Sequence, residues 1–211
     1  MNVYLTEIKL YDADAARIFP ANPYDWHKVV WSFFPNKSER DFLYRVDYTS
    51  RGVRLMLLSQ TEPVSPLKND CHSYKCREIP ISFFSHSLYR FQVRVNPTKR
   101  IKKDARTGTI VEKGMRVPIT DEYELKQWLK RKGESFGFSL SDLQDVSILF
   151  ESRLNFQKKG YRKAHHYSVQ FSGVLRVENA DLFRNSFIQG IGSAKSFGFG
   201  LLMLQPLNYN N

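Results

Sequence analysis

The sequence contains few cysteines and no long apolar segment. Only two cysteines, Cys71 and Cys76, occur among its 211 residues. Two thiols at this spacing form no disulfide framework and are too few for a zinc site with four protein ligands. The longest apolar runs, such as residues 29–34, are far shorter than the roughly 20 residues that a membrane-spanning helix needs. The composition therefore argues against a disulfide-rich secreted protein, and we expect no transmembrane helix.

The sequence also lacks the common motifs for metal binding, nucleotide binding and secretion. The chain has no Walker-type phosphate loop and no HExxH zinc motif, and its first residues lack the charged and apolar regions of a secretory signal. The glycines of residues 190–200 follow an expected helix, whereas a dinucleotide fingerprint needs them between a strand and the start of a helix. We therefore expect no metal, no cofactor and a cytoplasmic location, so that any chemistry uses side chains, above all a histidine.

Positive charge, in contrast, is abundant. Lysine and arginine number 32 against 21 acidic residues, which gives a formal net charge of +11. Such an excess indicates an anionic polymer as the partner. Residues 99–116 and 158–163 concentrate this charge around turn-forming residues, which predicts two basic fingers. A basic run is often only a solvated loop, but fingers carrying lysine and arginine also suit the phosphates of an RNA duplex.

The hydrophobic periodicity predicts a β-α-β-β order in the first half. The expected elements are a strand at 3–10, a helix from Asn22 and Pro23 to Phe34, and strands at 42–46 and 53–58. Residues 61–87 give weak signals, although 77–83 could supply one more strand. This weak segment is the expected domain boundary.

The second half reads as β-α-β-β-α-β. Its expected elements are a strand at 89–96, a helix from Thr120 to Gly133, strands at 146–156 and 167–177, a helix from Asn179 to Gln189, and a strand at 201–204. Acidic residues begin the first of these helices and basic residues end it, as the helix dipole favours. This order is ferredoxin-like, and the first half resembles a copy without the second helix. We expect an α+β protein with two ferredoxin-like domains, residues 1–86 and 87–211.

The first predicted helix separates into two faces. At about 100° per residue, one face is apolar, and the opposite face carries Tyr24, His27, Lys28 and Trp31. If the apolar face docks on the sheet, His27 points outward with Tyr24 one turn before it. An exposed histidine in such a position is often merely solvated. The other histidines, His72, His86, His165 and His166, are reserve candidates without a comparable cluster.

This outward cluster suits RNA cleavage by the ribose 2′-hydroxyl group. The reaction needs a group that takes the 2′ proton, a group that protonates the 5′ oxygen, and positive charge beside the phosphorane. A histidine exchanges protons near neutral pH, a tyrosine positions through its hydroxyl, and a lysine supplies charge. The candidate catalytic residues are therefore His27, Tyr24 and Lys28.

The candidate RNA-binding residues lie in the basic fingers and in the glycine-rich segment, where the backbone can approach phosphates closely. A structural turn is the alternative for the glycines. The candidates are Lys99, Arg100, Lys102, Lys103, Arg106, Arg116, Lys158, Lys159, Arg162, Lys163, Gly190, Gly192, Lys195, Gly198 and Gly200.

Three segments resemble a known family. They are the ending QGIGSAKSFGFGLLMLQPL, the helix with Tyr24 and His27 that runs into WSFFP, and the segment RDFLYRV from Arg40 to Val46. Together they resemble the CasE family, the CRISPR repeat-cleaving endoribonucleases of the type I-E Cascade system. The likeness extends over nearly the whole chain, and the glycine-rich ending is its most specific part.

The resemblance implies tandem ferredoxin-like domains of the RAMP type and metal-independent cleavage at the 3′ base of the repeat stem-loop in precursor CRISPR RNA. The products would carry a 5′-hydroxyl and a 2′,3′-cyclic or 3′ phosphate. The resemblance assigns catalytic roles to His27 and Tyr24, and it assigns binding of the RNA stem to residues 99–116. Other Cascade proteins would be partners, and the isolated protein would contact neither membrane nor DNA. The alternative function is that of a non-catalytic subunit that only holds an RNA hairpin.

Overall fold

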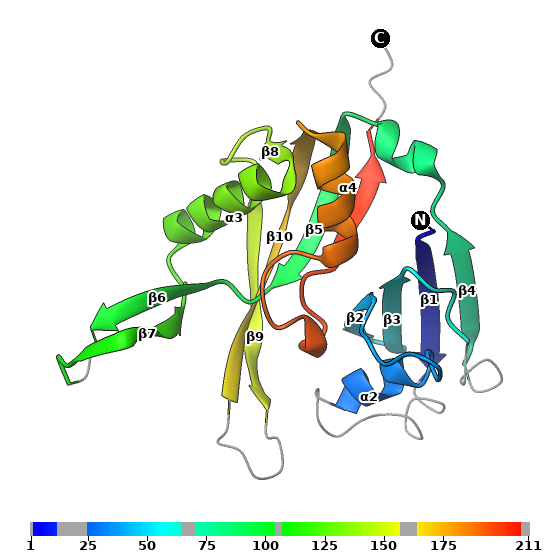
Figure 1. Ribbon diagram of the computed structural model, residues 1–211, viewed down its shortest axis with the longest axis horizontal. Coiled ribbons are helices and arrows are strands. Elements are labelled where there is room, and N and C mark those ends of the chain that lie inside the picture. The colour runs from blue at the N-terminus through cyan, green and yellow to red at the C-terminus, as the bar shows by residue number, and fades with distance from the viewer. Residues whose placement is uncertain (1, 12–24, 65–70, 104–106, 157–163, 208–211) are drawn as a thin grey trace.

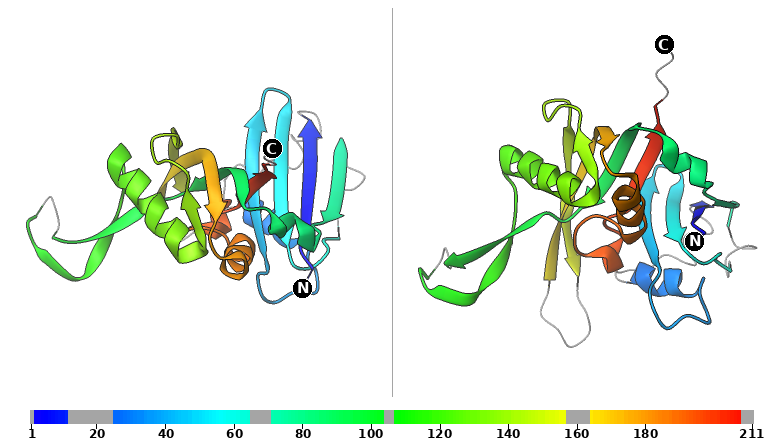
Figure 2. Two further views of the ribbon diagram at one scale, coloured as in Figure 1. Left: turned by 90° about the horizontal axis from the view of Figure 1, so that it is seen from above. Right: turned by 45° about the horizontal axis from the view of Figure 1, so that its top comes forward.

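The computed structural model describes residues 2–11, 25–64, 71–103, 107–156 and 164–207. Two antiparallel sheets lie beside each other, and a separate two-stranded arm projects away from both (Figures 1 and 2). Within these residues no helix is long and apolar enough to span a membrane.

The first sheet belongs to the first half of the chain. Its strands are β1 (Tyr4–Tyr11), β2 (Phe42–Thr49), β3 (Gly52–Ser59) and β4 (Ser73–Glu78). They are ordered β2-β3-β1-β4, and each neighbouring pair is antiparallel. The last strand therefore lies earlier than the expected 77–83, and η1 (Ile81–Ser85) follows it. The described residues between β3 and β4 contain no helix, as expected for this half.

The second sheet has the same topology as the first, because in both the first strand of the half lies between its last two strands. Its strands are β5 (Leu88–Val95), β8 (Phe138–Leu140), β9 (Ser147–Phe156), β10 (Ala164–Val177) and β11 (Leu202–Pro206). The order β11-β5-β10 continues to β9 along one part of β10 and to β8 along another. The three-residue β8 was not expected. Both sheets thus follow the ferredoxin-like order, which confirms the predicted α+β fold, and the domain division after residue 86 stays a prediction.

Helix α2 (Asp25–Trp31) covers one face of the first sheet, while α3 (Glu122–Phe136) and α4 (Ala180–Gln189) cover one face of the second (Figure 1). The start expected for the first helix, at Asn22 and Pro23, lies outside the described residues. Its end comes before Phe34 because residues 32–34 form tight turns. Asn179 caps α4 as predicted, since its side chain accepts from the Leu182 N–H group at 2.9 Å.

The predicted ends of α3 were wrong. The side chain of Asp121, not Thr120, accepts from the Glu124 N–H group at 2.9 Å and so caps the helix. Gly133 lies inside α3, where a Cβ atom would approach the Phe138 carbonyl oxygen to 2.7 Å. The helix ends at Gly137, whose left-handed conformation with φ 78° favours glycine. Its last turn therefore contains no basic residue, contrary to the expected charge pattern.

Residues 42–46 of strand β2 are buried on both faces, which holds the two halves together. Alternate side chains, such as Phe42 and Tyr44, pack with α2, while Leu43 belongs to the core of the second half. A polar bridge lies beside this apolar contact. Arg94 of β5 donates to the Val46 carbonyl oxygen at 2.6 Å and to the Asp47 carboxylate at 2.8 Å. Both halves therefore share one buried interface.

The described residues of the predicted basic segment 99–116 form the arm, with β6 (Thr98–Lys103) paired to β7 (Ile110–Pro118). Near its base, Lys99 forms an ion pair with Glu124 of α3, with its Nζ atom 2.7 and 2.5 Å from the two carboxylate oxygens. This pair links the base of the arm to α3, and the Ile119 N–H group donates to the Pro97 carbonyl oxygen at the same end of the arm.

The α3 cap gives a prediction about stability. Asp121→Ala should lower the free energy of unfolding by about 1 kcal/mol, because the Glu124 N–H group loses its acceptor. Thr120→Ala is the matched control and should change stability much less. Urea unfolding monitored by circular dichroism measures both, and an equal or larger loss in the Thr120 variant would contradict the assigned cap.

Candidate active site and nucleic-acid interface

His27 lies on α2 and is half-buried rather than fully outward as expected. The Trp31 indole N–H group, one turn later, donates to His27 Nε2 at 3.0 Å. Two rings of β2 face the imidazole, with centroids 6.4 Å away for Phe42 and 6.5 Å for Tyr44. The helix pattern predicted an outward His27, and this was wrong in part, because the ring lies against β2 residues that belong to the same core as the apolar face of α2.

The environment of His27 favours the neutral imidazole. Burial lowers the pKa of His27, and the positive charge of Arg40 lowers it further. A neutral imidazole has a nitrogen lone pair that can accept a hydrogen bond or a proton near neutral pH. The site therefore keeps the ring in the neutral form that a proton acceptor must have.

The glycine-rich segment brings a second group of side chains to this place. The Tyr44 hydroxyl donates to the Ser196 carbonyl oxygen at 2.6 Å, and Arg40 donates to the Ser196 hydroxyl at 2.9 Å. Ser196 belongs to η2 (Lys195–Phe197), which contacts α2 and β2. Burial lowers the pKa of Lys195, as do the nearby charges of Arg40 and Lys132. Positive charge is therefore concentrated beside His27.

The glycines in this segment serve mainly to shape it. The N–H groups of Gly190, Gly198 and Gly200 donate to carbonyl oxygens of the protein itself. At Gly200, with φ +90°, a Cβ atom would lie 2.6 Å from the Ile191 carbonyl oxygen. Gly190 has a positive φ of 76° but an extended ψ of 155°, so the expected left-handed helix end is wrong. These three N–H groups are therefore engaged within the protein, and the approach of this segment to phosphates stays a prediction.

A basic groove of about 450 Å³ runs between the arm, α3 and the glycine-rich segment. The cationic residues that line it are Lys99, Arg100, Arg116, Lys132 and Lys195. Gly190, Gly192, Trp128 and Phe136 complete much of the lining. The structure thus brings together the base of the arm and the glycine-rich segment, which the sequence could not place side by side.

Lys132 was missed as a candidate because its charge was attributed to the end of the helix. Its Nζ atom lies 5.9 Å from the ring centroid of Trp128 and 5.6 Å from that of Phe136. These residues follow one another at intervals of four, so they form a single row on α3. The row faces the groove. That spacing is the sequence signal that could have identified Lys132.

Arg40 was also missed as a site residue, although it belongs to the segment that resembles the family. Its contact with Ser196 joins residues 156 positions apart, so no local pattern could have found it.

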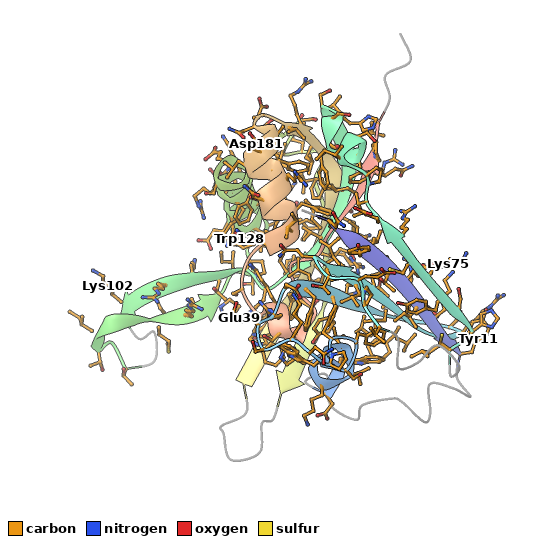
Figure 3. The ribbon with its side chains drawn as sticks, turned by 45° about the vertical axis from the view of Figure 1, so that its right-hand side comes forward. Tyr11, Glu39, Lys75, Lys102, Trp128 and Asp181 are labelled. Atoms are coloured by element: carbon orange, nitrogen blue, oxygen red, sulfur yellow. The ribbon has the colours of Figure 1, made fainter. Side chains whose placement is uncertain are left out.

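Other candidates lie apart from this groove or outside the described residues. Lys28 is exposed and pairs with Asp25 at 2.6 Å on its own helix. Lys102 is exposed on the arm, away from Trp128 (Figure 3), and Lys103 lies in β6. The candidates that fall outside the described residues are Tyr24, Arg106, Lys158, Lys159, Arg162 and Lys163.

The reserve histidines have other contacts. His72 stacks on Tyr11 with ring centroids 3.9 Å apart. His166 lies 2.9 Å from the Asn96 amide nitrogen, and burial lowers its pKa. The His166 ring also packs against Phe197 of η2, with centroids 4.8 Å apart, so it contacts the glycine-rich segment. Only His27 combines a proton-accepting ring with the Arg40 charge among these three.

Known proteins match nearly the whole chain. A family model described as "CRISPR associated protein" matches residues 3–206. The Cascade subunit CasE of Escherichia coli is 34% identical over 200 residues, which cover 91% of this chain and 96% of CasE. The endoribonuclease Cse3 of Thermus thermophilus is 28% identical over 224 residues, with coverage of 97% and 100%.

A solved structure supports the same relationship. Thermus thermophilus Cse3, bound to an RNA that represents a pre-cleavage complex, superposes with a TM-score of 0.80 at 26% identity. The match covers 98% of this chain and all of that chain. The sequence and the fold therefore agree, and the chain belongs to the CRISPR-associated protein family that contains CasE and Cse3.

Proposed function

We propose that this protein is an endoribonuclease that binds the repeat stem-loop of precursor CRISPR RNA and cleaves it at the 3′ base of the stem. One observation carries the proposal. His27, with a lowered pKa, lies beside Arg40, and Arg40 and Lys195 connect this position to the basic groove. A strand whose phosphates follow the groove would thus arrive at a proton-accepting ring that is flanked by cations.

The proposed reaction is an attack by the 2′-oxygen on the adjacent phosphorus. His27 takes the 2′ proton, the new O2′–P bond forms, and the P–O5′ bond breaks. The 5′ oxygen leaves with a proton supplied by solvent water, which gives a 5′-hydroxyl and a 2′,3′-cyclic phosphate. Arg40 and Lys195 stabilise the negative charge of the phosphorane. Tyr24 and Lys28 stay in the proposal as assisting residues, since Tyr24 precedes His27 by one turn in the sequence.

The biological setting follows from the relatives. CasE is a Cascade subunit, and Cse3 has been seen with RNA. By extension, this protein keeps its cleaved hairpin, assembles with other Cascade proteins and acts in the cytoplasm. The basic arm and groove serve RNA in this proposal, and no contact with DNA is assigned to the isolated protein.

Replacing the histidine should separate cleavage from binding. His27→Ala should reduce cleavage of the protein's cognate repeat hairpin at least about 100-fold, because proton transfer at the 2′-oxygen loses its acceptor. Hairpin affinity should stay within a few-fold, since many phosphate contacts remain. Single-turnover cleavage and gel-shift titration measure the two quantities.

His86→Ala is the matched control for this experiment, because His86 contacts Tyr89 outside the groove and should leave cleavage intact. Continued cleavage by the His27 variant would refute the catalytic role. A wild-type protein that binds the repeat tightly without cutting it would instead favour the non-catalytic RNA-holding subunit.

Removing one groove charge should weaken binding in a salt-dependent way. Lys132→Ala should lower hairpin affinity several-fold and reduce the slope of log K against log salt by about 0.7 to 0.9, as expected for one lost phosphate contact. Lys130→Ala removes the same charge from an exposed position that does not line the groove. Titrations at several salt concentrations compare them, and equal slopes for the two variants would remove Lys132 from the RNA footprint.

A further inference from the structure

The hydrogen bond between Trp31 and His27 has only one possible direction. An indole N–H group is a donor and never an acceptor. Because Trp31 Nε1 lies 3.0 Å from His27 Nε2, the Nε2 atom must present its lone pair to the indole. In a neutral imidazole the other ring nitrogen then carries the proton. The contact therefore selects the tautomer of His27 that is protonated on Nδ1.

Ring packing holds the indole in place for this contact. Trp31 meets Phe42 of β2 edge to face, with centroids 5.1 Å apart and an interplanar angle of 82°. Phe42 in turn stacks on Phe34 with centroids 4.9 Å apart. Trp31 and His27 are also four residues apart on α2, so their side chains are neighbours on one helix face. The donor is thus positioned by the fold before any substrate arrives.

We propose that Trp31 is a positioning residue that fixes the tautomer of His27, so that Nε2 is the atom that accepts the 2′-hydroxyl proton. This inference rests on the proposed function. When RNA binds, the 2′-hydroxyl group replaces the indole N–H group as the donor to Nε2. The proton then passes from O2′ to Nε2 as the O2′–P bond forms and the P–O5′ bond breaks, and solvent water supplies the proton of the leaving 5′ oxygen. Trp31 therefore keeps His27 Nε2 unprotonated, with its lone pair oriented to accept the 2′ proton.

The same contact opposes protonation of the ring. An imidazolium carries a proton on Nε2 and cannot accept from the indole, so Trp31 favours the neutral form. The charged and titratable groups that surround His27 are Arg40 before β2, Tyr44 on β2, Lys195 in η2, and Asp25 with Lys28 on α2 itself. Trp31→Phe changes none of these groups and removes the donor while it keeps an aromatic ring beside Phe42.

Trp31→Phe should therefore change the protonation of His27 more than its packing. The pKa of His27 should rise in the variant, and the neutral ring should populate both tautomers instead of the Nδ1-protonated one. Long-range ¹H–¹⁵N spectra of the imidazoles, recorded across a pH series in the RNA-free protein, report both properties. The chain has 5 histidines, and the signal that disappears in His27→Ala identifies the right one.

Trp26→Phe is the matched control on the same helix. It also loses an indole hydrogen bond, because Trp26 Nε1 donates to the Tyr48 hydroxyl at 3.0 Å, but that bond does not involve His27. The control should leave the pKa and tautomer of His27 unchanged. An unaltered His27 signal in Trp31→Phe, or the same change in both variants, would overturn the positioning role.

Cleavage provides the second measurement. The acidic limb of the pH–rate profile should move to higher pH in Trp31→Phe, with a several-fold slower rate near about pH 6 and a smaller loss at higher pH. A uniform loss at every pH would indicate damage to the helix and would contradict the proposal. Cleavage by His27→Ala would instead refute the proposed function, whereas the tautomer measured without RNA would still stand, so the two failures are distinguishable.

Discussion

The hydrogen bond from the Tyr44 hydroxyl to the Ser196 carbonyl oxygen is the contact on which the site depends. Tyr44 is only 1% exposed and lies in the first sheet, whereas Ser196 lies in the glycine-rich segment after α4. The bond therefore places Lys195 beside the helix that carries His27. Gly198 makes this approach possible, because even a Cβ atom there would come within 3.3 Å of the Tyr44 ring. Without this docking, the basic groove and the histidine would be separate features.

Strand β2 organises both sides of the site. On one face its aromatic rings pack against His27 and Trp31, and on the other Leu43 and Arg45 reach the second half of the molecule. A strand buried on both faces loses the alternation of polar and apolar residues that marks a half-exposed strand. The same strand thus lowers the pKa of the histidine through burial and joins the two sheets. This packing on both faces suits a site in which a proton acceptor must be held within hydrogen-bonding distance of one hydroxyl group.

Local signals predicted most elements of the fold, and long-range contacts account for what they missed. The sequence predicted the alternation in β5, the Asn179 cap and the basic arm, but it predicted an outward His27 where the structure has a half-buried one. Thr120 and Asp121 are adjacent potential caps, and only backbone geometry distinguishes them. Gly133 resembled a helix end but serves a close contact with Phe138. The contact of Arg40 with Ser196 and the packing of β2 rings against His27 involve residues in other elements, which periodicity does not report. Lys132 did have a local signal, the spacing of four residues from Trp128 and Phe136.

The central claim is that the 2′-hydroxyl group of the RNA is the nucleophile and that no metal ion takes part. The most direct test is single-turnover cleavage of the labelled repeat hairpin in EDTA, beside an identical hairpin with one 2′-deoxyribose just upstream of the cut. The account predicts cleavage of the all-ribose RNA alone, with a 2′,3′-cyclic or 3′ phosphate on the upstream product. Cleavage of the deoxy-substituted RNA, or a requirement for added divalent cations, would contradict it.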